Sequence, residues 1–302
     1  MTGYVTNFQQ VTTQLPTPIA WEITRTDGEV CDSFRFDFPF EASLRAALSA
    51  ATRFQAKQAG QVVFFGIVDD YSVSITPRGC ICTLRGRGMG GILLDNEVPA
   101  RTWTNATMDS ILNAYAAPFG VTHNTPALSL SGNYAVALGS SAMQALRVFA
   151  LNAGALPPRF LNNGALSIAL TRTNSGFQFH EGELLSARLH DCRKGVISKQ
   201  YSRKSGNITL LGNATFLAEG GAAQKYSAIT NQSLLAAPRI ALSKRERRTL
   251  QLLFTGSFLA EPSKRVQVTL PSLNLSDWFY VTQCKSTSDA DGTLCELTLS
   301  QY

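Results

Sequence analysis

The chain has 302 residues, which is enough for two or three domains with sizeable hydrophobic cores. Charged residues make up 16% of the sequence, against roughly 25% in soluble proteins generally, and the net charge is +6. Such a low charge content predicts either a polar uncharged surface or surface that is buried in an assembly, and we favour assembly because interface cores are depleted in charge. No apolar run reaches the ~18 residues that a membrane span needs, so membrane insertion is not expected.

The segment 1–95 predicts a small, mostly antiparallel β domain with one helix. Two strand-like runs within 19–38 flank Asp27-Gly28, which is a hairpin signal, and Phe34, Phe36 and Phe38 share one face of the second run. The segment 41–60 is rich in alanine and lacks a breaker before its final glycine, which predicts a helix. Further β-rich runs follow up to residue 88.

The segment 96–180 predicts an α+β middle domain. One helix is expected over 106–117, with Asn105 as its N-cap and Pro118 as its stop. A second helix is expected after Ser140 or Ser141, and an alternating run near 166–170 predicts a strand.

The segment 181–302 is again rich in strands, and its small and polar residues predict an insert around 216–252. The C-terminal end predicts a hairpin whose turn is Asp289-Ala290-Asp291-Gly292. Cys284 and Cys295 lie on the two strands of this hairpin. A disulfide between them requires a particular strand register, which the sequence does not fix.

A glycine motif, G-x-G-x-x-G, is formed by Gly86, Gly88 and Gly91, and this pattern can bind a dinucleotide pyrophosphate. Such a loop needs a helix that opens on it within a βαβ unit. Here Pro99 limits any helix to a very short one, and the flanking strands predict antiparallel pairing. We therefore expect no nucleotide cofactor.

Catalytic and metal motifs are also weak. The sequence has no G-x-S-x-G elbow and no H-E-x-x-H helix, and Cys80-x-Cys82 has no second pair at a zinc spacing. Asp69-Asp70 are adjacent carboxylates of the kind usually found at a turn or a solvated edge. We expect no catalytic residue, no metal and no cofactor, and therefore a protein that is not an enzyme. A cell-wall hydrolase stays as an alternative.

Basic residues gather in two clusters, which predict either a solvated face or a surface for phosphates or an acidic partner. No aromatic-interleaved motif of a nucleic-acid module accompanies them, although a basic β-barrel that binds nucleic acid stays as an alternative. The clusters are Arg188, Arg193, Lys194, Lys199, Arg203 and Lys204, and Arg239, Lys244, Arg245, Arg247 and Arg248.

A scattered pattern of residues resembles the baseplate hub proteins of contractile phage tails, including the late control protein D family and the hub of Mu-like phages. In these, a strand runs into Gly-Arg, followed by Leu-x-Asp or a similar step and then by a tryptophan and an asparagine before a helix. The matching residues here are Gly86, Arg87, Leu93 or Leu94, Asp95, Trp103 and Asn105, and Trp278 matches a tryptophan strand near the C-terminus.

This resemblance implies a fold that is α+β but mostly β, with two tail-tube-like antiparallel β-barrels, an α+β domain between them and an insertion in the second barrel. It also implies a homotrimer whose six barrels form a ring. Such a ring joins the hexameric tail tube, or a tube adaptor, to a trimeric spike, contacts other baseplate proteins and leaves a lumen through which DNA could pass. The implied location is the virion tail, assembled in the bacterial host cytoplasm.

Overall fold

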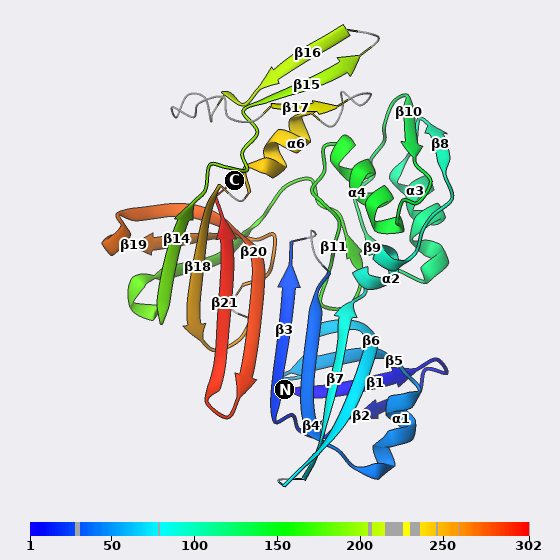
Figure 1. Ribbon diagram of the computed structural model, residues 1–302, viewed down its shortest axis with the longest axis vertical. Coiled ribbons are helices and arrows are strands. Elements are labelled where there is room, and N and C mark those ends of the chain that lie inside the picture. Colours follow the sequence, from blue (N-terminus) through cyan, green and yellow to red (C-terminus); the bar gives the residue numbers. More distant parts are fainter. Residues whose placement is uncertain are drawn as a thin grey trace. The chain divides into compact units, whose positions relative to one another are not determined.

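The computed structural model of the chain describes residues 1–27, 31–77, 79–204, 207–214, 226–229, 236–245, 247–258 and 260–301. The fold is mostly β, with large antiparallel sheets and a few short helices (Figure 1). The chain divides into two compact units. The first comprises Met1–Thr171, Thr255–Glu261 and Gln283–Cys295, and the second comprises Arg172–Phe254, Pro262–Thr282 and Glu296–Tyr302.

The first unit is built on an antiparallel sheet with the strand order β3-β4-β7-β6-β5-β1-β2. Alternate residues of these strands point to one side and form an aromatic core in which Phe34 stacks on Phe54 at 4.0 Å between ring centres. The strands are β1 (Thr2–Asn7), β2 (Thr12–Gln14), β3 (Ala20–Thr26), β4 (Ser33–Pro39), β5 (Ala51–Gln58), β6 (Gln61–Thr76) and β7 (Gly79–Gly88).

The hairpin predicted within 19–38 is present, because β3 and β4 pair antiparallel, with Trp21 opposite Phe36. Its predicted turn includes Gly28, which lies outside the described residues. Phe34, Phe36 and Phe38 are all buried, as expected for one face of a strand.

The prediction of a helix over 41–60 is wrong for most of that segment. A 3₁₀ turn (Ala42–Leu44) and a short helix α1 (Arg45–Ser49) occupy its beginning, and β5 occupies the rest. The strand is favoured because Phe54 and Ala56 alternate into the core while β5 pairs with β1 on one side and β6 on the other. Burial and pairing with both neighbours outweigh the helix propensity of alanine, which is small per residue.

The rest of the first unit has its own hydrophobic core, separate from that of the sheet, around Ile111, Leu146 and Phe149. Both predicted helices are present, although the first is capped by Thr107 and not by Asn105, and the predicted strand near 166–170 is only two residues long. The elements are α2 (Gly90–Asp95), β8 (Arg101–Thr104), α3 (Met108–Tyr115), a 3₁₀ turn (Ala117–Phe119), β9 (His123–Asn124), β10 (Asn133–Val136), α4 (Ala142–Asn152), β11 (Arg159–Phe160) and β12 (Leu166–Ser167).

The second unit contains a sheet with the strand order β14-β18-β21-β20-β19-β13, in which β13 runs parallel to β19. The C-terminal hairpin of β20 and β21 is present as predicted, and each of these strands contributes residues to both units. The strands are β13 (Asn174–His180), β14 (Ser186–Asp191), β18 (Arg248–Thr255), β19 (Arg265–Leu270), β20 (Leu275–Asp289) and β21 (Gly292–Ser300), with 3₁₀ turns at Glu181–Glu183 and Pro271–Leu273.

A smaller three-stranded sheet and a helix lie between β14 and β18 in the chain. They are β15 (Lys199–Lys204), β16 (Asn207–Gly212), β17 (Tyr226–Ile229) and α6 (Ala236–Ser243), with the sheet order β16-β15-β17. Within the predicted insert, residues 216–225 and 230–235 lie outside the described residues. The last residues of this range belong to β18, which begins at Arg248 and pairs with β14. The division into domains 1–95, 96–180 and 181–302 stays a prediction.

Candidate functional site

The residues of the hub-like pattern begin where β7 ends, and Gly86 shows why a glycine is needed there. A Cβ atom at this position would lie 2.0 Å from the Ile67 carbonyl oxygen and 2.6 Å from the Phe34 ring. On the neighbouring strand β6, a Cβ at Gly66 would lie 2.1 Å from the Arg87 carbonyl oxygen. The glycines therefore permit a close approach of strands.

The context of the G-x-G-x-x-G motif agrees with this structural role. Strand β7 pairs antiparallel with both β4 and β6, and helix α2 has only six residues. Gly88 allows the Asp32 side chain to approach, since a Cβ there would lie 2.9 Å from the Asp32 Cβ. The expectation that the loop does not form a dinucleotide-binding βαβ unit is confirmed by this geometry.

Arg87 connects the end of β7 to α2 through two carboxylates. Its Nε and Nη2 atoms donate to the two oxygens of Asp69 at 2.8 and 2.9 Å. Its Nη1 and Nη2 atoms donate to the two oxygens of Asp95 at 2.9 and 2.7 Å. This arrangement uses the planar fork of the guanidinium on both sides, a geometry that a lysine cannot reproduce.

The two hydrogen-bonded ion pairs of Arg87 with Asp69 and Asp95 form a clamp, and the pKa shifts of its side chains agree with it. The hydrogen bonds that Arg87 donates to Asp69, and then those to Asp95, raise the pKa of the Arg87 guanidinium. The hydrogen bonds from Arg87 lower the pKa of the Asp95 carboxyl. All three side chains are a third or more exposed, so the clamp fixes geometry more than it adds stability.

Asp69 is the residue of this clamp that the sequence did not reveal. The register of β6 against β7 shifts between Val68 and Asp70, so Asp69 is the extra residue of a β-bulge. The bulge lies within a strand and not at a turn, and it lets Asp69 reach Arg87. A bulge is set by pairing with another strand, and two adjacent aspartates in the sequence give no sign of it.

Trp103 and Asn105 lie farther along the chain, around β8 and the approach to α3. The Arg101 guanidinium lies 3.9 Å from the centre of the Trp103 ring, and the Trp103 Nε1 donates a hydrogen bond to the Tyr115 hydroxyl at 3.1 Å. Asn105 has a φ of +51°, and its Oδ1 accepts a hydrogen bond from the Gly132 backbone N–H at 2.9 Å. Asn105 therefore shapes the chain reversal before α3.

Thr107 performs the capping role that was predicted for Asn105. Its hydroxyl accepts from the Ser110 backbone N–H at 3.2 Å, and the Ser110 hydroxyl accepts from the Thr107 backbone N–H at 3.1 Å. This is a capping box.

Trp278 lies in the second unit on β20, with the Arg265 guanidinium 5.4 Å from its ring centre. Trp103 and Trp278 both stack on arginines.

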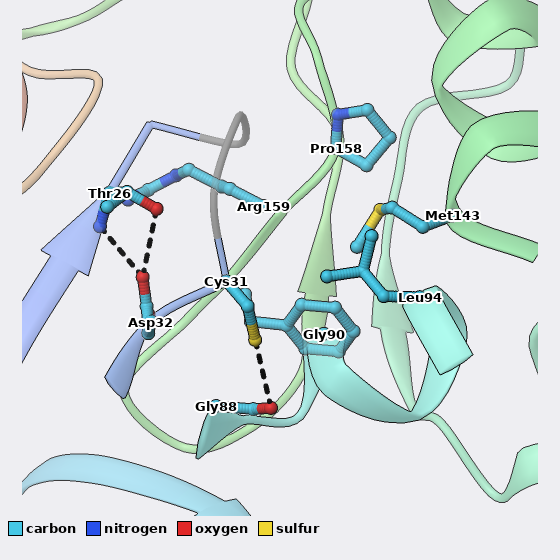
Figure 2. A pocket seen from close by; sticks show the side chains of 10 residues that line it. Thr26, Cys31, Asp32, Gly88, Gly90, Leu94, Met143, Pro158 and Arg159 are labelled. Carbon is cyan, nitrogen blue, oxygen red and sulfur yellow. Dashed lines mark hydrogen bonds between the residues drawn. The ribbon is translucent and has the colours of Figure 1, made fainter. Parts of the chain in front are cut away.

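Leu94 lines a small cavity behind the glycine motif, and Figure 2 shows its side chain beside Met143 and Pro158. The cavity has a volume of about 30 Å³, which is the space of about one water molecule. On the other side of this cavity, the Asp32 carboxylate accepts a hydrogen bond from the Thr26 N–H at 2.7 Å, and the Cys31 thiol donates one to the Gly88 carbonyl at 3.4 Å (Figure 2). A nucleotide or a peptide does not fit here.

Asp32 and Cys31 are partly buried at this cavity, and the loss of solvent changes the pKa of each side chain. Burial raises the pKa of the Asp32 carboxyl to about 6, against the lowering effects of the Thr26 hydrogen bonds and the charges of Arg25 and Arg159. Burial also raises the pKa of the Cys31 thiol to about 12, so this thiol is neutral and a weak nucleophile near neutral pH.

The second basic cluster differs from the predicted surface patch. Arg245 and Arg247 are buried, and the Nε of Arg247 lies 3.9 Å from an Asp191 carboxylate oxygen, while Arg239 is exposed. In the first cluster, Arg203 and Lys204 have side chains outside the described residues.

Within the part of the chain that the structure describes, no group of three or more His, Cys, Asp and Glu side chains could hold a metal ion, and no helix has the length and hydropathy of a membrane span.

Comparison with known proteins finds matches in structure but not in sequence. No protein-family model and no curated protein sequence matches the chain. The 43 kDa tail protein of prophage MuSo2 from Shewanella oneidensis is 16% identical, with a TM-score of 0.80 over 100% of this chain and 98% of that chain. The tail protein from Neisseria meningitidis is 18% identical, with a TM-score of 0.78 over 99% of this chain and 96% of that chain.

A more distant match is the E. coli c3393 protein, a component of the type VI secretion system that is structurally similar to the bacteriophage T4 tail proteins gp27 and gp5. It is 11% identical, with a TM-score of 0.58 over 94% of this chain and 73% of that chain. These matches confirm, at the level of the fold, the resemblance to phage tail and baseplate hub proteins that the sequence indicated.

Proposed function

We propose that the chain is a structural baseplate hub of a phage or phage-derived contractile tail. The observation that carries this proposal is the match of its whole length to tail proteins of similar length, at TM-scores of 0.78 and 0.80. The clamp of Arg87, Asp69 and Asp95 supports a structural role, because both carboxylates are already engaged by the same guanidinium.

In this proposal, three chains form a ring, and each chain contributes two barrel-like β domains, so that the ring has six. Such a ring matches a hexameric tail tube or a tube adaptor on one face and a trimeric spike on the other. Strand β14 is at one end of its sheet order and β2 at an end of the other. Exposed strand edges attract further strands, and neighbouring subunits of a closed ring would cover them.

The oligomeric state tests the proposal directly. Light scattering coupled to size exclusion should give three times the chain mass of 32.7 kDa, and electron microscopy of the same fraction should show a ring with six densities. A chain that stays monomeric at high concentration, both in solution and in the images, contradicts the ring.

Three exposed apolar side chains help to locate the interfaces of such a ring. Phe8, Ile75 and Leu138 are 87%, 84% and 87% exposed, so replacing each with aspartate should leave the folded chain intact. A variant that dissociates the trimer without loss of thermal stability marks an interface. The remaining variants serve as matched controls, because they carry the same change of charge.

A peptidoglycan-hydrolysis assay and a DNA-binding titration separate the proposal from its rivals. We expect no hydrolysis, and no affinity for DNA that falls steeply with salt. Turnover of peptidoglycan by the purified trimer supports the hydrolase alternative, and a steep salt dependence of DNA binding supports the nucleic-acid alternative.

A further inference from the structure

Cys284 and Cys295 form a close pair of thiols on the two strands of the C-terminal hairpin. Their sulfur atoms lie 3.6 Å apart, both side chains are fully buried, and both residues belong to the first unit. Neither is in a disulfide. The register left open by the sequence therefore brings the two thiols into contact.

Arg25 places a positive charge beside this pair. Strand β3 pairs with β20 so that Arg25 lies opposite Cys284, and its Nη2 is 3.9 Å from the Cys284 sulfur. The guanidinium is itself held in place, because Nη1 donates to Asn162 at 2.7 Å and the group lies 4.9 Å from the centre of the Phe258 ring. The hydrogen bond with Cys295 and the charge of Arg25 lower the pKa of the Cys284 thiol.

We propose that Cys284 and Cys295 are an oxidisable pair that closes to an intrachain disulfide when hydrogen peroxide reaches it, and that this bond staples β20 to β21. The two sulfurs need to approach by about 1.5 Å to reach bonding distance. Rotation of two side chains on adjacent strands supplies a movement of this size. The inference does not depend on the proposed hub function.

The chemistry proceeds in two balanced steps. The Cys284 thiolate attacks one oxygen of hydrogen peroxide, the O–O bond breaks, and the leaving hydroxide takes up a proton to become water, which leaves a sulfenic acid on Cys284. The sulfur of Cys295 then attacks that sulfur, the S–O bond breaks, and the hydroxyl leaves as water with the thiol proton. Two thiols and one peroxide thus give one disulfide and two waters.

Within the described residues, Cys31, Cys80 and Cys82 make no sulfur–sulfur contact of the kind that joins Cys284 to Cys295. Burial raises the pKa of Cys31 to about 12 and that of Cys82 to about 11, which disfavours both reactive thiolates. Cys80 is exposed and is therefore the competitor for oxidants that reach the surface. The pair is distinguished from Cys80 by forming its product within one chain.

Peptide mapping of the full-length chain tests the proposal, because trypsin cleaves between the two cysteines. Cleavage after Arg265 and Lys285 gives the peptides 266–285 and 286–302, each with one cysteine and no internal Lys or Arg. The reduced protein is treated with hydrogen peroxide, quenched, denatured, alkylated with iodoacetamide and digested without reductant. We expect the two peptides to be recovered joined, at a mass lower by two hydrogens than their sum, and to separate on reduction.

Two variants serve as controls for the mapping. Cys80→Ser should leave the yield of the joined peptides unchanged. Cys295→Ser should abolish the joined product and leave a sulfenic acid on Cys284 that dimedone traps. The wild-type result decides the question even if the buried Cys295→Ser variant folds poorly. The oxidised wild type should also melt at a higher temperature than the reduced protein, because the bond restricts the unfolded chain.

The proposal is overturned if 266–285 and 286–302 are recovered separately, each alkylated, at a peroxide dose that has already oxidised Cys80. It is also overturned if the joined peptides come from disulfide-linked dimers. Electrophoresis without reductant distinguishes these dimers from a monomer that carries the intrachain bond.

Discussion

Arg87 and Asp95 form a two-pronged ion pair, with nitrogen–oxygen distances of 2.9 and 2.7 Å, across the junction where β7 leads into α2. The second side of the same guanidinium holds Asp69 on β6. One side chain thus fixes the direction in which the chain leaves the sheet and enters the part of the first unit that has its own core. The hub-like pattern of Gly86, Arg87 and Asp95 is explained by this junction.

Replacing Arg87 with lysine should weaken this junction modestly. A single ammonium group cannot satisfy two carboxylates with two hydrogen bonds each, so one of the aspartates loses its partner. The side chains are partly exposed, and we expect a loss of about 1 kcal/mol or less in the free energy of unfolding, measured in urea.

Arg85→Lys is the matched control for this change, because Arg85 is exposed and lies two residues earlier on β7. It should leave the urea midpoint unchanged. Equal effects of the two substitutions would show that the fork geometry of Arg87 has no importance.

Gly86→Ala should be far more damaging than its size suggests. The added Cβ would lie 2.0 Å from the Ile67 carbonyl oxygen, which is backbone and cannot move aside without shifting β6. Overpacking of this kind costs about 1–3 kcal/mol or more, and we expect a lower melting temperature and a lower soluble yield. Gly182→Ala is the control, since nothing lies within 4 Å of a Cβ at that position.

Asn105→Ala should destabilise the turn before α3. The change removes the hydrogen bond from Gly132 N–H to Oδ1 and places alanine, which tolerates the left-handed region less well than asparagine, at a φ of +51°. We expect a loss of about 1–2 kcal/mol in the free energy of unfolding. Asn105→Asp keeps the acceptor and should lose less, and Asn105→Gly relieves the backbone while it loses the bond. An Asp variant as unstable as the Ala variant would contradict the role of the acceptor.

The sequence predicted elements well where local signals and burial agree. The β3–β4 hairpin and the three buried phenylalanines follow from alternation, and α4 begins after Ser141, which the sequence offered as a cap. It failed at 41–60, where helix propensity and β pairing conflict. Phe54 and Ala56 lie in the core because β5 pairs with two neighbouring strands. One of these strands is β1, which is far away in the sequence.

The sequence predicted which residues belong to the candidate site better than it predicted the contacts among them. Gly86, Arg87 and Asp95 were identified by their resemblance to a known pattern, and the structure joins Arg87 to Asp95. Asp69 was missed because its place depends on a bulge, and the approach of Cys284 to Cys295 could not be foreseen because it depends on register. Both are properties of strand pairing, which a single strand's sequence does not specify.

Asp32 predicts an unusual dependence of stability on pH. Burial raises the pKa of its carboxyl to about 6 in the folded chain, above the ordinary value near 4 that it has when unfolded. A raised folded pKa means that the folded state binds the proton more tightly. The contribution of Asp32 is therefore fully favourable below about pH 4 and is lost as the pH rises through about 6.

Asp32→Asn, which mimics the protonated carboxyl and keeps an acceptor for the Thr26 N–H, should remove this loss. The stability of Asp32→Asn relative to wild type, from urea unfolding, should rise between about pH 4 and about pH 8 by on the order of 3 kcal/mol. Asp95→Asn is the control, because Arg87 lowers the pKa of Asp95 and its stabilising contribution is lost only as the pH falls below about 4, so this variant should stay parallel to wild type between about pH 4 and about pH 8. If Asp32→Asn also tracks wild type in parallel across this range, the Asp32 carboxyl is not coupled to folding as the structure indicates.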